Sequence, residues 1–355
     1  MSILRKIIAL TLVTLAIFIL SSGTQIKSLS SWSLNNSKIA NVIVIFFETD
    51  DPYTMRVIES FKEIEGKEQN RIKYTFPNPK NNIAINSEIL VEALQSDYDL
   101  FILYLPDTRE NAVEDVINRV RQRNKPLILM NIPTEVVAKV SKIYEKVAFV
   151  TPDSKKAGIA QGNIIVNLWN SNNKLMDKNN DNVLQYVLLK GPANDPQVAD
   201  RTNYAISTIN NSGIKTQEIS VVGANWSRDL ARTSIDNLFL KYDGSIEAII
   251  SNNDAMAIGA IEALQKYGYN KGDKSRNIVV VGVDGLPEAK DLIDKGIMAG
   301  TVIQDPKVQA ELLNTVGMNL INNLKPTENT NYKIVDGQII IPFPYDIYTG
   351  KTSNP

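Results

Sequence analysis

The 355-residue chain contains no cysteine and no histidine. Without cysteine there is no disulfide, no thiolate metal site and no cysteine nucleophile. Without histidine, the Ser-His-Asp triad, most zinc sites and the commonest general base are excluded. Carboxylate or lysine chemistry remains available, so these absences argue against an enzyme without excluding one.

The chain also lacks an excess of charge of either sign. Its 38 Lys and Arg residues are balanced by 39 Asp and Glu residues, so the formal net charge is -1. No broad basic field exists to hold nucleic acid. The length suffices for two domains of ordinary globular size.

The N-terminus has the pattern of an export signal. Arg5 and Lys6 precede an apolar run over residues 7–20, which small residues follow. This run is shorter than the roughly 20 residues that span a bilayer. Residues 1–23 are therefore predicted to be a signal peptide or, if uncleaved, a membrane anchor, and residues 24–40 a leader or tether. The protein is expected in the periplasm or on the extracellular face of the cell membrane.

Beyond this segment, short apolar runs alternate with amphipathic stretches. Near-continuous apolar strands between helices predict parallel sheets covered on both faces. Strands are predicted at residues 41–47, 72–76, 99–105, 126–131, 146–150, 182–189, 214–221, 246–251, 277–283 and 298–303. Helices are predicted at 52–64, 86–94, 112–123, 155–168, 197–209, 228–240, 255–266, 287–295 and 307–323, with a last extended piece at 339–342.

This rhythm repeats in two halves with a seam near residues 150–153. The predicted fold is α/β, with two doubly wound parallel-sheet lobes joined by a multi-crossing hinge around a cleft. The N-terminal lobe is assigned residues 41–151 and 305–342. The C-terminal lobe is assigned residues 152–304 and 343–355.

Polar side chains gather where the predicted strands end, at the edge where open α/β sheets bind ligands. Asp51, Asn131, Asn253, Asp284 and Gln304 are in such positions. Several of them could equally cap the helices that follow. Their convergence on one cleft would instead make a binding site.

Two aromatic residues and one arginine stand near the same edge. Tyr53 and Trp226 each follow a strand end, and aromatic faces beside polar groups suit a sugar ring. Each could equally pack against its own lobe. Arg201 offers five fixed donors, which suit paired hydroxyls, a carboxylate or a surface salt bridge.

Residues 177–185 carry side-chain oxygens at alternating positions, with one backbone carbonyl between them. Such spacing can wrap oxygens around one hard cation, and calcium takes six to eight. The candidate ligands are Asp177, Asn179, Asp181, the Val183 carbonyl and Gln185. A complete site needs a further carboxylate from elsewhere, and the alternative is a solvated Asn/Asp-rich turn.

Four motifs resemble those of the bacterial galactose/glucose-binding proteins, which are two-lobed periplasmic sugar receptors that feed ABC transporters. These motifs are TPDSKKAGIAQG, VLLKGPANDPQVADR, ISNNDAMAIGAIEAL and VVVGVDGLPEAKDLIDKGIMAGTV. The resemblance runs from about residue 42 to 348 and is strongest from 150 to 305. It implies a monomer that binds a galactose- or glucose-like hexose and delivers it to an ABC permease.

The resemblance also implies roles for single residues. The implied sugar contacts are Asp51, Tyr53, Asn131, Arg201, Trp226, Asn253 and Asp284. At three further contact positions the chain departs from the family, with Asp195 for a His, Gln197 for an Asp and Gln304 for an Asn. Glu247 matches the family's remote calcium ligand and would complete a structural Ca²⁺ site.

The sequence also bears on three functions other than that of a transport receptor. A domain tethered by an uncleaved apolar segment would report sugar to a histidine kinase or chemoreceptor. A transcription factor of similar fold is excluded, because no helix-turn-helix precedes the lobes. An enzyme is not expected, because the chain has no histidine, no cysteine and no glycine-rich phosphate loop.

Overall fold

The computed structural model describes residues 38–68, 71–242 and 245–350. The predicted signal segment and nearly all of the leader lie outside the described residues. Within the described ranges, no helix is both long and apolar enough to cross a membrane. The body that begins at Ile39 contains two sheets, described in turn below.

The first sheet is parallel except at one edge, where β11 pairs antiparallel to β12. The register runs unbroken through its centre, with Ile43 opposite Phe101 and Phe101 opposite Leu127. In spatial order its strands are β11 (Ile334–Val335), β12 (Gln338–Ile341), β5 (Val147–Pro152), β4 (Leu127–Met130), β3 (Leu100–Tyr104), β1 (Ala40–Ile45) and β2 (Ile72–Thr75).

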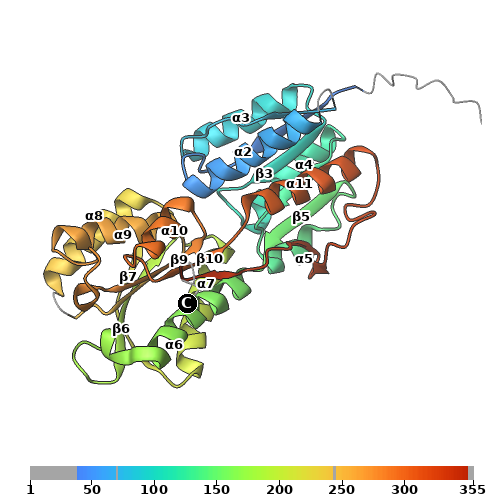
Figure 1. Cartoon of the computed structure of the whole chain (residues 1–355). Helices are drawn as coiled ribbons and strands as arrows, with labels where there is room; N and C mark the ends of the chain where they lie inside the picture. Colours follow the sequence, from blue (N-terminus) through green and yellow to red (C-terminus); the bar gives the residue numbers. More distant parts are fainter. Residues whose placement is uncertain (1–37, 69–70, 243–244, 351–355) are drawn as a thin grey trace, which may run out of the picture. The chain divides into compact units, whose positions relative to one another are not determined.

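Helices bury both faces of this sheet, which explains why its strands are apolar at nearly every position. Val42 and Val44 of β1 pack in one core with α2 and α11, which lie side by side in Figure 1. Ile43 and Ile45 pack in the opposite core with α3, α4 and α5. The helices are α2 (Pro52–Lys67), α3 (Ile83–Gln95), α4 (Glu110–Gln122), α5 (Thr134–Val140) and α11 (Pro306–Ile321).

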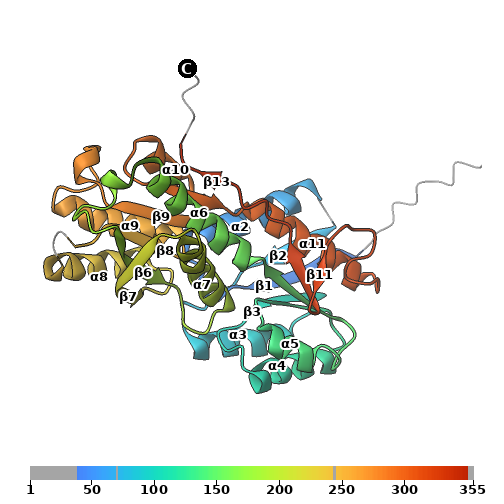
Figure 2. The same ribbon diagram turned by 90° about the horizontal axis from the view of Figure 1, so that it is seen from below.

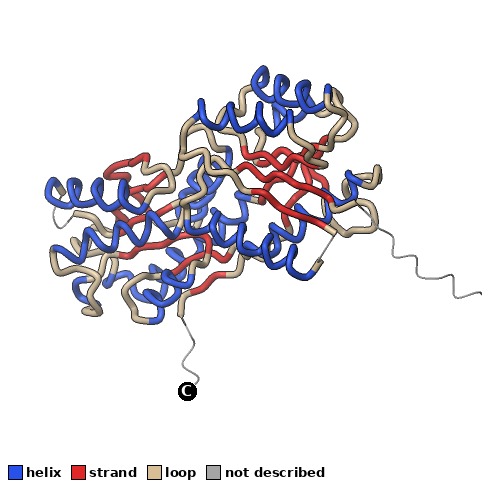
Figure 3. Tube along the Cα trace, turned by 90° about the horizontal axis from the view of Figure 1, so that it is seen from above, coloured by secondary structure: helices blue, strands red, loops and turns tan. Residues whose placement is uncertain are grey.

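The second sheet has the same plan, with helices on both faces of its strands (Figures 2 and 3). Its strands in order are β13 (Ile347–Tyr348, antiparallel), β10 (Gly300–Ile303), β9 (Val279–Asp284), β8 (Ala248–Ser251), β6 (Val183–Lys190) and β7 (Lys215–Gly223). One face packs against α6 (Ser154–Asn172) and α7 (Pro196–Asn211). The other packs against α8 (Arg228–Lys241), α9 (Asp254–Lys266) and α10 (Pro287–Asp294).

The chain passes from one sheet to the other three times, after β5, after β10 and after β12. The predicted α/β fold with two parallel-sheet lobes is confirmed. Each predicted strand and helix is present, with ends that differ by a few residues. The elements α5, β11 and β13 were not predicted, because α5 spans less than two helical turns and the two strands have two residues each.

Candidate functional site

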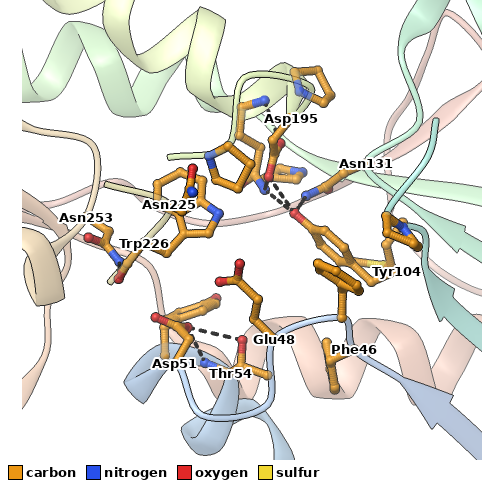
Figure 4. A pocket seen from close by; sticks show the side chains of 18 of the residues that line it. Phe46, Glu48, Asp51, Thr54, Tyr104, Asn131, Asp195, Asn225, Trp226 and Asn253 are labelled. Atoms are coloured by element: carbon orange, nitrogen blue, oxygen red, sulfur yellow. Dashed lines mark hydrogen bonds between the residues drawn. The ribbon is translucent and has the colours of Figure 1, made fainter. Parts of the chain in front are cut away.

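A cavity of about 550 Å³ lies where strands of both sheets end. This volume is in the range of small-molecule sites. All ten side chains predicted to contact a ligand line it, namely Asp51, Tyr53, Asn131, Asp195, Gln197, Arg201, Trp226, Asn253, Asp284 and Gln304. Their contact with a ligand stays a prediction, but the structure brings them to one place (Figure 4).

Helix capping positions three of these residues, so capping and lining the cavity are not alternatives. Asp51, Asp195 and Asn253 are the N-caps of α2, α7 and α9, and each accepts a backbone N–H of the first turn. Asp51 uses Oδ2 for this bond, while its Oδ1 is buried without a partner among the described residues. The capping interpretation was wrong for Asp284, because α10 begins after Leu286 and has no side-chain cap.

The backbone at Trp226 is strained, and this conformation goes with the placement of its ring at the cavity wall. Its φ of 62° lies in the left-handed region, which bulky residues rarely adopt. The strain is maintained because the indole packs over Gly191, where an added Cβ would lie 2.4 Å from a ring atom. Gly191 is thus needed for the ring's placement at the cavity wall.

Arg201 organises the base of the cavity. Its guanidinium donates to the Asn252 carbonyl at 2.7 Å and to the Gln304 Oε1 at 2.9 Å, and it lies 4.0 Å from the Asp284 carboxylate. Burial raises the pKa of Asp284, and Arg201 opposes that rise. Nε of Arg201 is buried without a partner in the described part of the chain, so this donor remains for a ligand.

Tyr104, at the end of β3, was missed by the sequence reasoning. Its hydroxyl donates to the Asp195 Oδ2 at 2.8 Å and accepts from the Asn131 Nδ2 at 2.6 Å and the Gln197 Nε2 at 2.9 Å. Tyr104 and Asn131 follow strands of the first sheet, whereas Asp195 and Gln197 begin α7 on the second. The phenol therefore links the two lobes across the cavity. It is the last residue of an apolar strand, a position that the strand-end rule covers without singling out this residue.

Glu48, in the loop after β1, was also missed. Its carboxylate points into the open space of the cavity in Figure 4 and has no hydrogen-bond partner among the described residues. Burial raises the pKa of Glu48 to about 7, and the charges of Asp51 and Asp195 add to the rise. The neighbouring Asp50 is exposed and does not line the cavity.

Glu48 should make the stability of the ligand-free protein depend on pH. Its folded-state pKa of about 7 exceeds the ordinary 4.5, so the stability that its protonated form supplies is lost as pH rises through 7. We expect Glu48→Gln to stabilise the protein by about 1–2 kcal/mol at pH 8, after allowance for solvent screening, and far less at pH 5. Thermal melts at both pH values check this, with Glu63→Gln on the exposed side of α2 as control. An equal shift at both pH values would contradict it.

The predicted calcium loop is compact. Asp177 accepts the backbone N–H groups of Asp181 and Asn182, and Glu247 accepts those of Lys178 and Gln185. In the described residues, no group of three or more Asp or Glu side chains is placed to hold a metal ion by itself. The Oε1 of Gln185 is nevertheless buried without a partner there, and two left-handed Asn residues make the turn tight. The donors are hard oxygens of the kind that calcium prefers, so the residues fit the ion.

Comparison with known proteins identifies the family. The periplasmic binding protein domain matches residues 41–325. The chain belongs to the periplasmic binding protein family. It is 30% identical over 326 residues to the D-galactose/methyl-galactoside binding periplasmic protein MglB of Haemophilus influenzae, covering 92% of this chain and 95% of that protein. Over 45% of the chain and 46% of the relative, it is 30% identical to the D-allose-binding periplasmic protein of Escherichia coli.

Solved structures of other proteins share the fold of this chain. An ABC transporter solute binding protein from Bacillus halodurans, with bound myo-inositol, has a TM-score of 0.66 at 21% identity and covers 82% of this chain and 91% of its own. The glucose-galactose binding protein GanP of Geobacillus stearothermophilus has a TM-score of 0.64 at 16% identity. It covers 87% of this chain and 96% of its own. The predicted resemblance is confirmed, and so is the expectation that the chain is not an enzyme, because its relatives are solute-binding proteins.

Proposed function

We propose that the protein binds a galactose- or glucose-like hexose between its lobes and delivers it to an ABC sugar transporter. The observation that carries this proposal is the set of unpaired polar atoms on residues lining one cavity. They are the Asp51 Oδ1, Asn131 Oδ1, Arg201 Nε and Gln304 Nε2, all buried without partners in the described chain. Buried polar atoms rarely lack hydrogen-bond partners, so a ligand rich in hydroxyl groups would supply the missing partners. The Trp226 ring in the wall would stack on the sugar's C–H face.

Fluorescence titration of residues 38–355 tests this function. We expect a saturable change in Trp emission with glucose or galactose, because Trp226 lies in the cavity wall. Xylose and ribose serve as smaller ligands, and Trp226→Phe identifies the reporting ring. Binding of a pentose alone would mean that Asp195 and Gln197 have changed the specificity. No response to any of these sugars would contradict the proposal.

The alternative is a tethered sugar sensor that signals to a histidine kinase or chemoreceptor. It is favoured by the sequence at residues 7–20, whose apolar run could stay attached as an anchor. N-terminal sequencing of the mature protein separates the two functions. A new N-terminus near residue 24 supports the exported receptor, and an intact Met1 supports the anchored sensor.

We further propose that the loop at 177–185, with Glu247, holds a structural Ca²⁺ ion. Three carboxylates would supply the negative charge, and Asn179, Gln185 and the Val183 carbonyl would supply the remaining oxygens. None of these residues lines the sugar cavity. The ion would therefore act on stability more than on sugar recognition.

Removal of calcium should lower stability. An ion present at about ten times its Kd adds about 1.4 kcal/mol to the free energy of unfolding. We expect a chelator to lower the Tm by the corresponding amount and added calcium to restore it. In Glu247→Gln the effect should vanish, whereas Asp291→Asn, an exposed change on α10, should retain it. A Tm that does not respond to chelation would contradict the calcium site.

A further inference from the structure

Glu48 is a carboxylate that the cavity does not neutralise. It lies in the loop between β1 and α2, half-buried, with its oxygens directed into the cavity (Figure 4). Neither oxygen has a hydrogen-bond partner in the part of the chain that the structure describes. The charges acting most strongly on it are those of Asp51 and Asp195, both of its own sign. A half-buried carboxylate in this position calls for a positive partner.

The other charges of the cavity do not supply that partner. Among its described lining residues, the acidic groups are Glu48, Asp51, Asp195 and Asp284, against the single cation Arg201. Arg201 lies 4.0 Å from Asp284 and donates to the Gln197 and Gln304 side chains. The remaining titratable groups, Tyr53 and Tyr104, are phenols whose pKa burial raises, so they are neutral. Burial raises the pKa of each of the four acids, and ionisation of all four would leave three negative charges uncompensated.

Resting on the proposed sugar-binding function, we infer that the cavity takes a sugar bearing a protonated amine, with the ammonium group held by Glu48 beside Asp51. An ammonium group has three donors. The Glu48 carboxylate and the unpaired Asp51 Oδ1, both from the loop before α2, can accept two of them. Asp195 would add attraction without a direct bond, because its Oδ2 already accepts from Tyr104.

A neutral hexose balances the charges of the same cavity less well. A hydroxyl in place of the ammonium group can donate one hydrogen bond to Glu48, but it leaves the charges of Glu48, Asp51 and Asp195 unbalanced. An ammonium group adds the attraction between opposite charges to its hydrogen bonds with a carboxylate, and a hydroxyl group does not. The amino sugar should therefore bind more tightly than its parent hexose, although the two have nearly the same shape.

Calorimetric titration at pH 7 tests the inference with D-glucosamine, D-galactosamine and 6-amino-6-deoxyglucose, each against its parent hexose. We expect at least one amine to bind about 10- to 100-fold more tightly than its parent. Glu48→Gln should reduce that ratio to less than about threefold, because a neutral amide lacks the negative charge that attracts the ammonium group. Glu63→Gln, an exposed change on α2 outside the cavity, should leave the ratio as it is. N-acetylglucosamine, which carries no charge, should not share the preference.

The outcomes separate this inference from the function on which it rests. A hexose that binds as tightly as all three amines would overturn the amino-sugar inference and leave the sugar receptor standing. An amine preference that survives Glu48→Gln would overturn the assignment of Glu48. If neither amines nor hexoses bind, both the inference and the proposed function fail.

Discussion

Replacement of Arg201 by Ala is expected to weaken sugar binding at least about 100-fold and to lower the free energy of unfolding by about 3–5 kcal/mol. The side chain is 5% exposed and donates hydrogen bonds to Asn252, Gln197 and Gln304. Its removal leaves the buried Asp284 carboxylate without the cation that opposes the rise in its pKa. The substitution should therefore disturb the cavity wall and destabilise the fold of the second lobe.

Two further variants separate binding from folding at this position. Arg201→Lys keeps a positive charge but loses the planar fork, so we expect it to fold better than Arg201→Ala while still binding poorly. Arg232→Ala removes a partly exposed Arg that pairs with Asp229 and Glu262 on the surface. That change should cost less than about 1 kcal/mol and leave affinity alone. Denaturant melts and sugar titrations measure both effects, and wild-type affinity in a folded Arg201→Ala protein would contradict the prediction.

Tyr104→Phe is expected to weaken sugar binding at least about 30-fold, equivalent to 2 kcal/mol or more. The phenol bridges Asn131 of the first lobe to Asp195 and Gln197 of the second. Contacts between lobes exist only when the cavity is closed, so their free energy favours closure and thereby ligand binding. Without the hydroxyl, Asp195 and Gln197 lose a partner at the half-buried cavity wall.

Tyr267→Phe is the matched control, because that phenol also donates to a carboxylate, Asp236 at 2.7 Å, but lies outside the cavity. It should leave affinity unchanged. Sugar titration gives the affinities, and small-angle scattering reports whether the ligand-free Tyr104→Phe protein is more open. Unchanged or tighter sugar binding by Tyr104→Phe would mean that the phenol competes with the ligand instead of favouring closure.

Much of the fold could be predicted because its signals are local. Buried parallel strands are apolar at every position, as in β3 and β4, and their connecting helices begin at Asp-Pro pairs such as Asp51-Pro52 and Asp305-Pro306. The elements that escaped prediction are α5, β11 and β13. Their residues gain stability from neighbours distant in the chain, as when Ile347 pairs with Val302, and short segments carry no period of their own.

Some of the cavity residues could likewise be predicted from the sequence, and others could not. Asp51, Asn253 and Asp284 could be predicted because parallel strands place their carboxyl ends at one edge. Trp226 was predicted from its place after a strand end, and Arg201 lies in one of the family motifs. Glu48 and Tyr104 could not be distinguished from ordinary residues at a strand end. Their importance depends on charges and donors that approach from other elements.

The sequence by itself determined the two-lobed α/β fold, the family and the edge of the sheets where a ligand would bind, because each depends on residues a few positions apart. Only the tertiary structure decided which side chains meet across the cavity. It joined Tyr104 to Asp195, 91 positions away, and placed Glu48 among carboxylates with no cation beside it in the described part of the chain. Charge balance and hydrogen bonding depend on distance in space, and that distance is set by how the two lobes pack.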